Sequence, residues 1–424
     1  MIILLNEWEP LSHYSLQPDY GWFHIYAFTM TMGMILAIGL AAVKLWIRKI
    51  PVMELLIGAV FIVPISLFGA SLIGKINKSE YPGFWSKFQF WEGGMAIHGG
   101  VLAGLISGLI IFHLIGRFRT KVSMWTYADA IVPNILIGQA VGRWGNFFNH
   151  ELHGMPVANV SRHDANPLSW MADWLTSNTQ FRYEGTDGVT INGLLMHRGD
   201  IYQMEPVFLY ESIGLLLVWL IVTFVIPGFG RWISKKPWKL FPDVYQLDWK
   251  YSFKVFFTLG KARVENKMTY YDIWNDAYYM TFEEDAVTNY EKYYREHVLP
   301  KAKLNIVDVW NNGHALEKAN NPHGFLTVKS GVEAGAYFLG WNIVRYAIDQ
   351  RRSLEDALIN YDRVASNAII ISSIVLGIII IALCQWVFPR LFRIPNYRYE
   401  KEYFALSSDL LQQIQEKKQL KASK

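Results

Sequence analysis

Long apolar runs alternate with short polar connections through most of the chain. A bilayer crossing needs about 20 mostly apolar residues, and five runs clearly meet this requirement: Phe23–Val43, Val52–Ile73, Ile97–Ile115, Val207–Ile226 and Ala368–Phe388. Two weaker runs are diluted by glycine and polar residues, as expected of helices that line a polar cavity; they are Tyr127–Phe147 and Val332–Ile348. The pattern predicts an all-α polytopic membrane protein with about seven transmembrane helices.

Two polar regions separate these runs. Residues 148–204, rich in Asn, Asp, Ser and Gly, are expected to form an outer loop after the fourth span. Residues 229–331 are predicted to be a soluble insert between the fifth and sixth spans, because about 100 residues dense in Tyr, Trp, Lys and Glu can hold a small domain. The remaining parts are a membrane core over 1–228 and 332–392 and a charged tail over 393–424. Within the tail, Ser407–Lys424 is interpreted as solvated, with a charged surface helix as the alternative.

Basic residues predict the orientation. They follow the first, third, fifth and seventh spans: Lys44, Arg48, Lys49, Arg117, Arg119, Lys121, Arg231, Lys235, Lys236, Lys239, Arg390 and Arg393. Cytoplasmic loops carry an excess of Lys and Arg, so the insert and the C-terminal tail are predicted to be cytoplasmic. The N-terminus and residues 148–204 are then predicted to lie outside. Met1–Tyr20 has neither a basic n-region nor a long apolar core, so we do not expect a cleavable signal peptide.

Composition agrees with a membrane protein. Hydrophobic residues make up 52% of the chain and charged residues 18%, whereas a soluble domain carries about a quarter charged residues. The net charge of +4 is mild and does not indicate a nucleic-acid partner. The single cysteine, Cys384, excludes an intrachain disulfide and is expected to pack as a small hydrophobe.

Polar residues concentrate at the end of the fourth span, in one stretch that contains Arg143, Asn146, Asn149, Glu151 and Gly154. A charge at membrane depth costs roughly 2.5–3.5 kcal/mol by insertion scales, so it usually marks a functional site. The stretch resembles the signature of the prolipoprotein diacylglyceryl transferases. The resemblance implies that these five residues belong to the site.

Further motifs carry the same resemblance. Trp91–Gly100 is similar to the family's Trp-x-Gly-Gly-x-x-x-His-Gly-Gly element and contributes His98, Gly99 and Gly100. A lone histidine beside glycines would ordinarily be a packed or capping residue. Tyr26 resembles the tyrosine that opens the family's first span, and a tyrosine of the interfacial belt is the alternative.

Two motifs lie in later spans. Glu205–Glu211, which contains Tyr210, looks like the family's Pro-x-x-Leu-Tyr-Glu element. Arg345–Arg352 looks like the family's Arg-x-x-x-Glu-x-x-Arg element, with Asp349 in place of the glutamate. Residues three and four apart are expected to share one helix face, and snorkelling arginines at the interface are the alternative. The resemblance covers residues 22–228 and 332–390 and not the insert.

The resemblance implies a reaction and its partners. The diacylglyceryl group of phosphatidylglycerol would pass to the lipobox cysteine thiol of prolipoproteins, forming a thioether and releasing glycerol phosphate. The location would be the bacterial cell membrane. The expected partners are phosphatidylglycerol, the prolipoprotein signal peptide and membrane lipids, and the insert could offer a surface to a cytoplasmic partner. No cofactor, metal ion or nucleic acid is expected.

Roles within this reaction follow from the chemistry of the groups. A thiol with a pKa of about 8.5 is mostly protonated at neutral pH, so a base or a cationic field must raise its thiolate fraction. Arginine suits the leaving phosphate, because its planar fork binds two oxygens and stays charged. Arg143 and Arg345 are therefore predicted to clamp the phosphate, with Asn146 and Tyr210 as donors. His98 is a candidate for the base or for a contact with the headgroup.

Two other functions stay open at this stage. Paired arginines and broken helices also occur in transporters of anionic substrates, although the chain shows no two similar halves. A homologue that has lost catalysis, with the insert as its working part, would explain Ser71, Glu205 and Asp349 at positions where the family has other residues.

Overall fold

The computed structural model describes residues 7–12, 14–76, 81, 83–89, 97–151, 153–352 and 362–422, most of them in helices. The chain divides into two compact units that are interleaved along the sequence. Unit 1 comprises residues 1–41, 131–223 and 334–380, and unit 2 comprises residues 42–130, 224–333 and 381–424.

Five helices of the described part are long and apolar enough to cross a membrane. Such segments become helical because the bilayer interior offers backbone groups no other hydrogen-bond partner. They are Ile25–Ile47 (α1), Met53–Lys75 (α2), Gly99–Thr120, Val207–Leu240 and Arg363–Leu391. The third lies within α3 (Ile97–Ile115) and a π-helical turn (Gly116–Thr120), and the fifth consists of α15 (Arg363–Ala382), a π-helical turn (Leu383–Val387) and α16 (Phe388–Leu391). The fourth contains α7 (Val207–Leu220), a π-helical turn (Ile221–Val225), α8 (Ile226–Ile233) and α9 (Pro237–Leu240). All five strongly apolar runs are thus confirmed as long apolar helices, and the protein is a multi-pass helical membrane protein.

The two weaker runs are also helical but are not among these five. The first forms α4 (Met124–Ile131), a 3-10 turn (Val132–Asn134) and α5 (Ile135–Phe148). Pro133 lies in that turn, where its missing N–H interrupts the helix. The second run forms α14 (Val332–Asp349). The count of seven spans stays a prediction.

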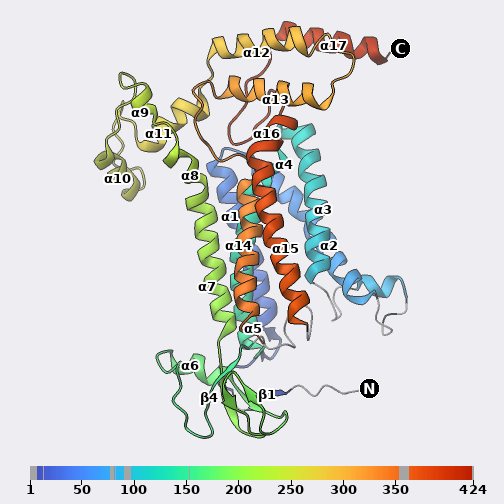
Figure 1. The fold of residues 1–424 in the computed structure, drawn as a ribbon, viewed down its shortest axis with the longest axis vertical. Coiled ribbons are helices and arrows are strands. Elements are labelled where there is room, and N and C mark those ends of the chain that lie inside the picture. The colour runs from blue at the N-terminus through green and yellow to red at the C-terminus, as the bar shows by residue number, and fades with distance from the viewer. Residues whose placement is uncertain are drawn as a thin grey trace. The chain divides into compact units, whose positions relative to one another are not determined.

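In unit 1, α5, α7 and α14 run side by side (Figure 1). Leu136 and Leu215 are fully buried between them, with the partly buried Trp341 of α14 against them. The hydroxyl of Ser212 donates to the carbonyl oxygen of Ala140 at 3.0 Å, which satisfies a polar group inside this contact.

Unit 1 also contains a small antiparallel sheet, at the end of these helices in Figure 1. Its strand order is β1 (Trp8–Pro10), β5 (Gln180–Tyr183), β8 (Ile201–Met204), β4 (Pro156–Asn159). Two-residue strands form separate ladders: β2 (Asp19–Tyr20) with β3 (Phe23–His24), and β6 (Thr190–Ile191) with β7 (Leu194–Leu195). A short helix, α6 (Asp173–Thr176), and a 3-10 turn, Ser177–Thr179, precede β5.

The sheet corrects the all-α prediction and the description of residues 148–204 as a loop. Its core is a buried cluster of Trp8, Phe181, Tyr183, Met196, Tyr202 and Met204, in which Phe181 and Tyr183 alternate along β5 and Tyr202 and Met204 along β8. Each strand is at most four residues long, too short for alternation to stand out in a polar region. One strand also comes from the distant N-terminal segment, so the pairing is not visible in the local sequence.

In unit 2, small residues allow α2 and α3 to pack closely. A Cβ placed on Gly99 would lie 2.8 Å from Cβ of Ile73 and closer still to the carbonyl oxygen of Gly69. The remaining elements of unit 2 are a 3-10 turn, Trp85–Phe88, and the helices α10 (Trp249–Phe257), α11 (Tyr270–Trp274, continued by a π-helical turn, Asn275–Met280), α12 (Glu284–His297), α13 (Ile306–Asn320) and α17 (Ser408–Ala422).

The C-terminal segment, residues 393–422, packs against the insert. Tyr399, Tyr403 and Phe404 form one buried cluster with Tyr290 of α12 and Leu316 of α13. Leu410 of α17 is also fully buried. Within it, Ser408–Ala422 forms the predicted alternative to a solvated tail, a charged surface helix, and most of its described side chains are exposed.

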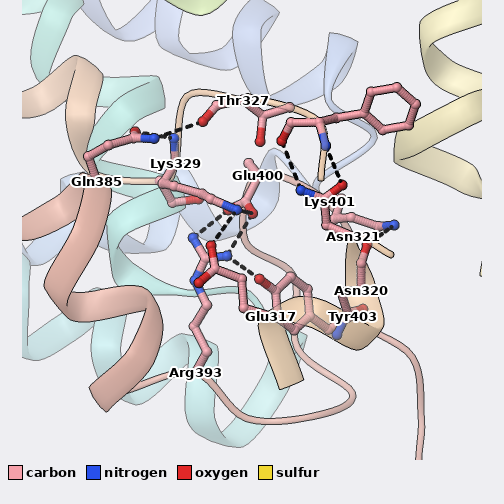
Figure 2. Close-up of polar contacts among 12 residues, drawn as sticks. Glu317, Asn320, Asn321, Thr327, Lys329, Gln385, Arg393, Glu400, Lys401 and Tyr403 are labelled. Atoms are coloured by element: carbon pink, nitrogen blue, oxygen red, sulfur yellow. Dashed lines mark hydrogen bonds and ion pairs between the residues drawn. The ribbon is translucent and has the colours of Figure 1, made fainter. Parts of the chain in front are cut away.

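A buried ionic network joins the same two segments (Figure 2). The carboxylate of Glu400 accepts two hydrogen bonds from the guanidinium of Arg393, at 2.6 and 2.5 Å, and lies 3.4 Å from the ammonium of Lys329. Lys329 also pairs with Glu317 of α13 at 3.1 Å. Burial would raise the pKa of Glu400, but Arg393 and Lys329 outweigh it and lower that pKa to about 2. The network is thus held by charges that compensate one another inside the protein.

Candidate active site

One carboxylate in unit 1 is held between two guanidiniums. Glu211, in the second turn of α7, forms an ion pair with Arg143 of α5 at 2.8 Å through one carboxylate oxygen. Its other oxygen accepts a hydrogen bond from Arg352 at 2.7 Å. The side chains of Glu211 and Arg352 are only 1% and 2% exposed, and that of Arg143 is 20% exposed. Two positive charges and one negative charge leave this arginine–glutamate cluster with one net positive charge.

The end of α5 continues the cluster as a chain of polar contacts. Arg143 donates to the side-chain oxygen of Asn146 at 3.4 Å, and the amide of Asn146 donates to Glu151 at 3.4 Å. Asn149 donates to the other oxygen of Glu151 at 3.3 Å. The helix ends at Phe148, and the turn after it brings Glu151 back to the carboxamides. These four predicted site residues are therefore brought together.

Asp349, the last residue of α14, is fully buried. Its nearest charged partner is Arg345, one helical turn earlier, at 3.7 Å. Neither carboxylate oxygen accepts a hydrogen bond within the part of the chain that the structure describes. Arg345 and Asp349 thus share a helix face, as the spacing predicts.

Arg352 does not share that face, which corrects the prediction. The helix ends at Asp349, and Arg352 follows a turn and pairs as an isolated bridge with Gly154. Arg363 stabilises this turn, because its guanidinium donates to the carbonyl oxygens of Gln350 at 3.2 Å and of Arg352 at 2.6 Å. The turn redirects the Arg352 side chain toward Glu211.

Gly154 lies where three segments meet. Its N–H donates to the carbonyl oxygen of Glu205 at 3.0 Å. A Cβ on this glycine would lie 2.6 Å from a methyl group of Val207 and 3.1 Å from the carbonyl oxygen of Arg351, so a larger residue does not fit.

Glu205 pairs with Arg351 at 3.3 Å. Burial raises the pKa of the Glu205 carboxyl, although Arg351 acts in the opposite direction.

The two predicted site tyrosines also belong to unit 1. Tyr210 is half-buried in the first turn of α7, next to Glu211 in the chain. Tyr26 lies in the first turn of α1, and a Cβ on Gly145 of α5 would be 2.9 Å from its ring, so the two helices touch there. Their assignment to the substrate stays a prediction.

His98, Gly99 and Gly100 belong to α3 in unit 2. The side chain of His98 and residues 91–96 of its motif lie outside the described residues. Gly99 and Gly100 face α2, where Gly69 and Ser66 approach them, so both glycines have a packing role. Ser71, also in α2, is fully buried.

Sequence reasoning missed Glu211 as a site residue. It stands in the quoted Pro-x-x-Leu-Tyr-Glu motif, yet only Tyr210 was assigned a role. An acidic residue at the start of an apolar span requires a cationic partner, and this requirement could have indicated Arg143 or Arg352. Arg351 was missed because the family pattern contains no arginine at that position.

The arrangement is suited to binding an anion. Arginine stays charged when desolvated and its planar fork matches two phosphate oxygens. Charge-assisted hydrogen bonds of this kind are roughly twice as strong as neutral ones. Fold and site together define a multi-pass helical membrane protein with a buried arginine–glutamate cluster where α5 ends and α7 begins.

The chain belongs to the prolipoprotein diacylglyceryl transferase family. Residues 21–241 match the family model of that description, which confirms the resemblance seen in the motifs. A phosphatidylglycerol–prolipoprotein diacylglyceryl transferase of Malacoplasma penetrans is 39% identical over 209 residues, which cover 44% of this chain and 53% of that protein. Proteins of the same name from Oceanobacillus iheyensis and Streptomyces coelicolor are 32% and 33% identical, over 46% and 49% of this chain and 60% and 53% of theirs. The chain spans about half the length of the curated relatives it matches.

Proposed function

We propose that the protein transfers the diacylglyceryl group of phosphatidylglycerol to the lipobox cysteine of prolipoproteins. One observation carries this proposal: Glu211 holds Arg143 and Arg352 together, at the start of an apolar helix, in a chain of this family. The Arg143 side chain of this cluster is 20% exposed, so its guanidinium can meet the phosphate of the lipid. The adjacent apolar helices suit the acyl chains.

The proposed reaction is a nucleophilic substitution at carbon. The cysteine sulfur loses its proton and forms a bond with the terminal carbon of the diacylglyceryl group. The bond between that carbon and the phosphate oxygen breaks, and glycerol phosphate leaves with the electron pair. Because negative charge grows on the leaving phosphate, preorganised positive charge lowers the barrier.

Arg143 and Arg345 are proposed to bind that phosphate, with Arg352 fixed by Glu211 in support. Asn146, Asn149, Glu151, Gly154 and Tyr210 would shape the headgroup site. The oxygens of Asp349, which accept no hydrogen bond from described residues, suit the hydroxyls of a glycerol headgroup. His98 is proposed either as the base for the thiol or as a headgroup contact, with Tyr26, Gly99 and Gly100 at the substrate.

We also propose a topology for the chain. Seven spans, formed by the five long apolar helices together with the α4–α5 segment and α14, would place the N-terminus outside and the C-terminus in the cytoplasm. The predicted organisation into a membrane core (1–228 and 332–392), a cytoplasmic insert (229–331) and a cytoplasmic tail (393–424) follows from the basic residues after alternate spans. The insert could then meet a cytoplasmic partner.

The test is a mass measurement. Purified protein is incubated with phosphatidylglycerol and a lipobox peptide, and a second peptide carries serine in place of cysteine. A gain of one diacylglyceryl group on the cysteine peptide alone is expected. An unchanged cysteine peptide would contradict the proposal and favour the transporter or the homologue without catalysis.

A further inference from the structure

The helix α10 exposes an unusual set of aromatic residues. Trp249, Phe253, Phe256 and Phe257 are between 52% and 77% exposed, and Leu259 just beyond the helix is 92% exposed. Their spacing of four, seven and eight residues places the four aromatic side chains on one helix face. Ring centroids of successive pairs lie 5.4–6.5 Å apart, so the rings form one continuous surface.

The opposite side of α10 holds the helix in place. Tyr251 and Val255, one turn apart, are buried. The side chain of Asp248 caps the helix by accepting from the N–H of Tyr251 at 3.0 Å. The aromatic face is therefore presented by a helix that is anchored on its other face.

Lysines flank the aromatic face. Lys250 and Lys254 lie on the helix beside the aromatic residues, and Lys261 follows the helix. All three are exposed, and within the described residues no carboxylate lies within 4.0 Å of their ammonium groups. Nearby Lys267, in contrast, pairs with Asp248 at 2.7 Å. An aromatic face bordered by cations without a carboxylate partner is complementary to a surface in which an apolar layer lies next to an anionic layer.

Chain connectivity limits where this surface can lie. Eight residues separate the apolar helical segment Val207–Leu240 from Trp249, and the nine steps from Leu240 to Trp249 span at most about 32 Å when fully extended. Figure 1 shows α9, α10 and α11 gathered beside the end of α8. The helix is thus tethered close to the point where the chain leaves the membrane.

We propose that α10 is a membrane-surface anchor of the insert, with its aromatic face in the interfacial layer of an anionic bilayer and its lysines at the lipid phosphates. Amphipathic helices with aromatic and basic residues bind membranes in this way, and basic residues near a membrane are attracted to anionic lipids. The inference depends on Val207–Leu240 crossing the membrane and is independent of the transferase reaction.

The test uses the full chain in nanodiscs of phosphatidylcholine, with or without phosphatidylserine. Cys384 is replaced by serine, and a nitroxide is attached at Phe253→Cys or Phe257→Cys. Exposed Asn289 of α12, replaced by cysteine, is the matched control. Collision rates with oxygen, which concentrates in lipid, and with a water-soluble nickel chelate report the depth of each label. Trypsin resistance confirms that each variant is folded.

With phosphatidylserine present, the ratio of oxygen to nickel collisions at positions 253 and 257 should exceed that at position 289 severalfold. Replacing the three lysines with glutamine should reduce this ratio severalfold. Nickel accessibility equal to that at Asn289 would overturn the proposal, and so would a label shielded from both reagents, which indicates a protein contact. A ratio that is the same without phosphatidylserine would overturn the assignment to an anionic surface.

Discussion

At the scale of single residues, Glu211 organises the site. Its two oxygens bind two different arginines from segments that are far apart in the sequence. Without the carboxylate, the guanidiniums of Arg143 and Arg352 would repel each other in a nearly dry environment. The residue therefore both orients the arginines and reduces the charge that the membrane protein must bury.

Replacing Arg143 or Arg345 with lysine should leave the protein folded and inserted but remove most transferase activity. A lysine keeps the charge, yet a point charge cannot reproduce a two-bond grip on phosphate. Turnover is measured with the lipobox peptide. Arg162→Lys, in an exposed pair with Asp200, is the control that should keep full activity. Wild-type turnover in both Arg143→Lys and Arg345→Lys would refute the clamp.

Glu211→Gln should destabilise the protein by about 3–5 kcal/mol, because removing one partner of a buried ion pair leaves uncompensated charge. Glu205→Gln is the matched control, since its partner Arg351 is 62% exposed and such exposed pairs contribute about 0–1 kcal/mol. Thermal unfolding in detergent compares the two. Equal melting temperatures would show that Glu211 does not hold the cluster.

At the scale of elements, the sequence predicts long helices better than short strands. Each long apolar helix is a continuous signal of about 20 residues, so all five were found. The sheet was missed because its strands are short and one of them, Trp8–Pro10, is remote in the sequence. The direction of the Arg352 side chain also could not be predicted from its helical spacing, because a turn stabilised by Arg363 ends the helix before residue 352.

The packing of the C-terminal segment was missed for a related reason. The solvated interpretation concerns Ser407–Lys424, whose helix stays largely exposed but buries Leu410. Before it, Glu400 and Arg393 neutralise each other in the interior. Tyr399, Tyr403 and Phe404 supply the apolar surface that packs against α12 and α13. Charge compensation depends on which residues meet in space, and a local pattern does not contain that information.

Acid should release the C-terminal segment from the insert. The pKa of Glu400 is lowered to about 2 in the folded protein, and an unperturbed glutamate has a pKa of about 4.3. The stabilisation from this carboxylate is thus fully present above pH ~4.3 and is lost as the pH falls toward 2. Hydrogen exchange of residues 393–422 should accelerate over this range. Glu400→Gln should exchange rapidly even at neutral pH, and exchange in that variant as slow as in the wild type would contradict this account.

In the whole molecule, the family match covers most of the N-terminal membrane core but only the first residues of the insert. The matched residues end at 241, close to where the insert begins. The insert instead forms a buried cluster and an ionic network with the C-terminal segment. The chain therefore combines family motifs with a folded addition that the family pattern does not contain.

The proposed topology predicts opposite labelling of two exposed positions. In a Cys384→Ser background, cysteine at Ser177 should react with an impermeant reagent from outside intact cells. Cysteine at Asn275 should react only after the membrane is opened, because it lies in the insert, which the basic residues place in the cytoplasm. Both positions are exposed, so a lack of reaction would not come from burial. Labelling of both from the same side would show that the span count is wrong.

The proposed reaction couples two events, release of glycerol phosphate and modification of a cysteine. The most direct measurement uses phosphatidylglycerol labelled in its glycerol headgroup and follows both products in one reaction with purified protein and lipobox peptide. We expect equal amounts of free glycerol phosphate and diacylglyceryl peptide, with both lost in Arg143→Lys. Glycerol phosphate without modified peptide, or neither product from folded protein, would contradict the proposed reaction.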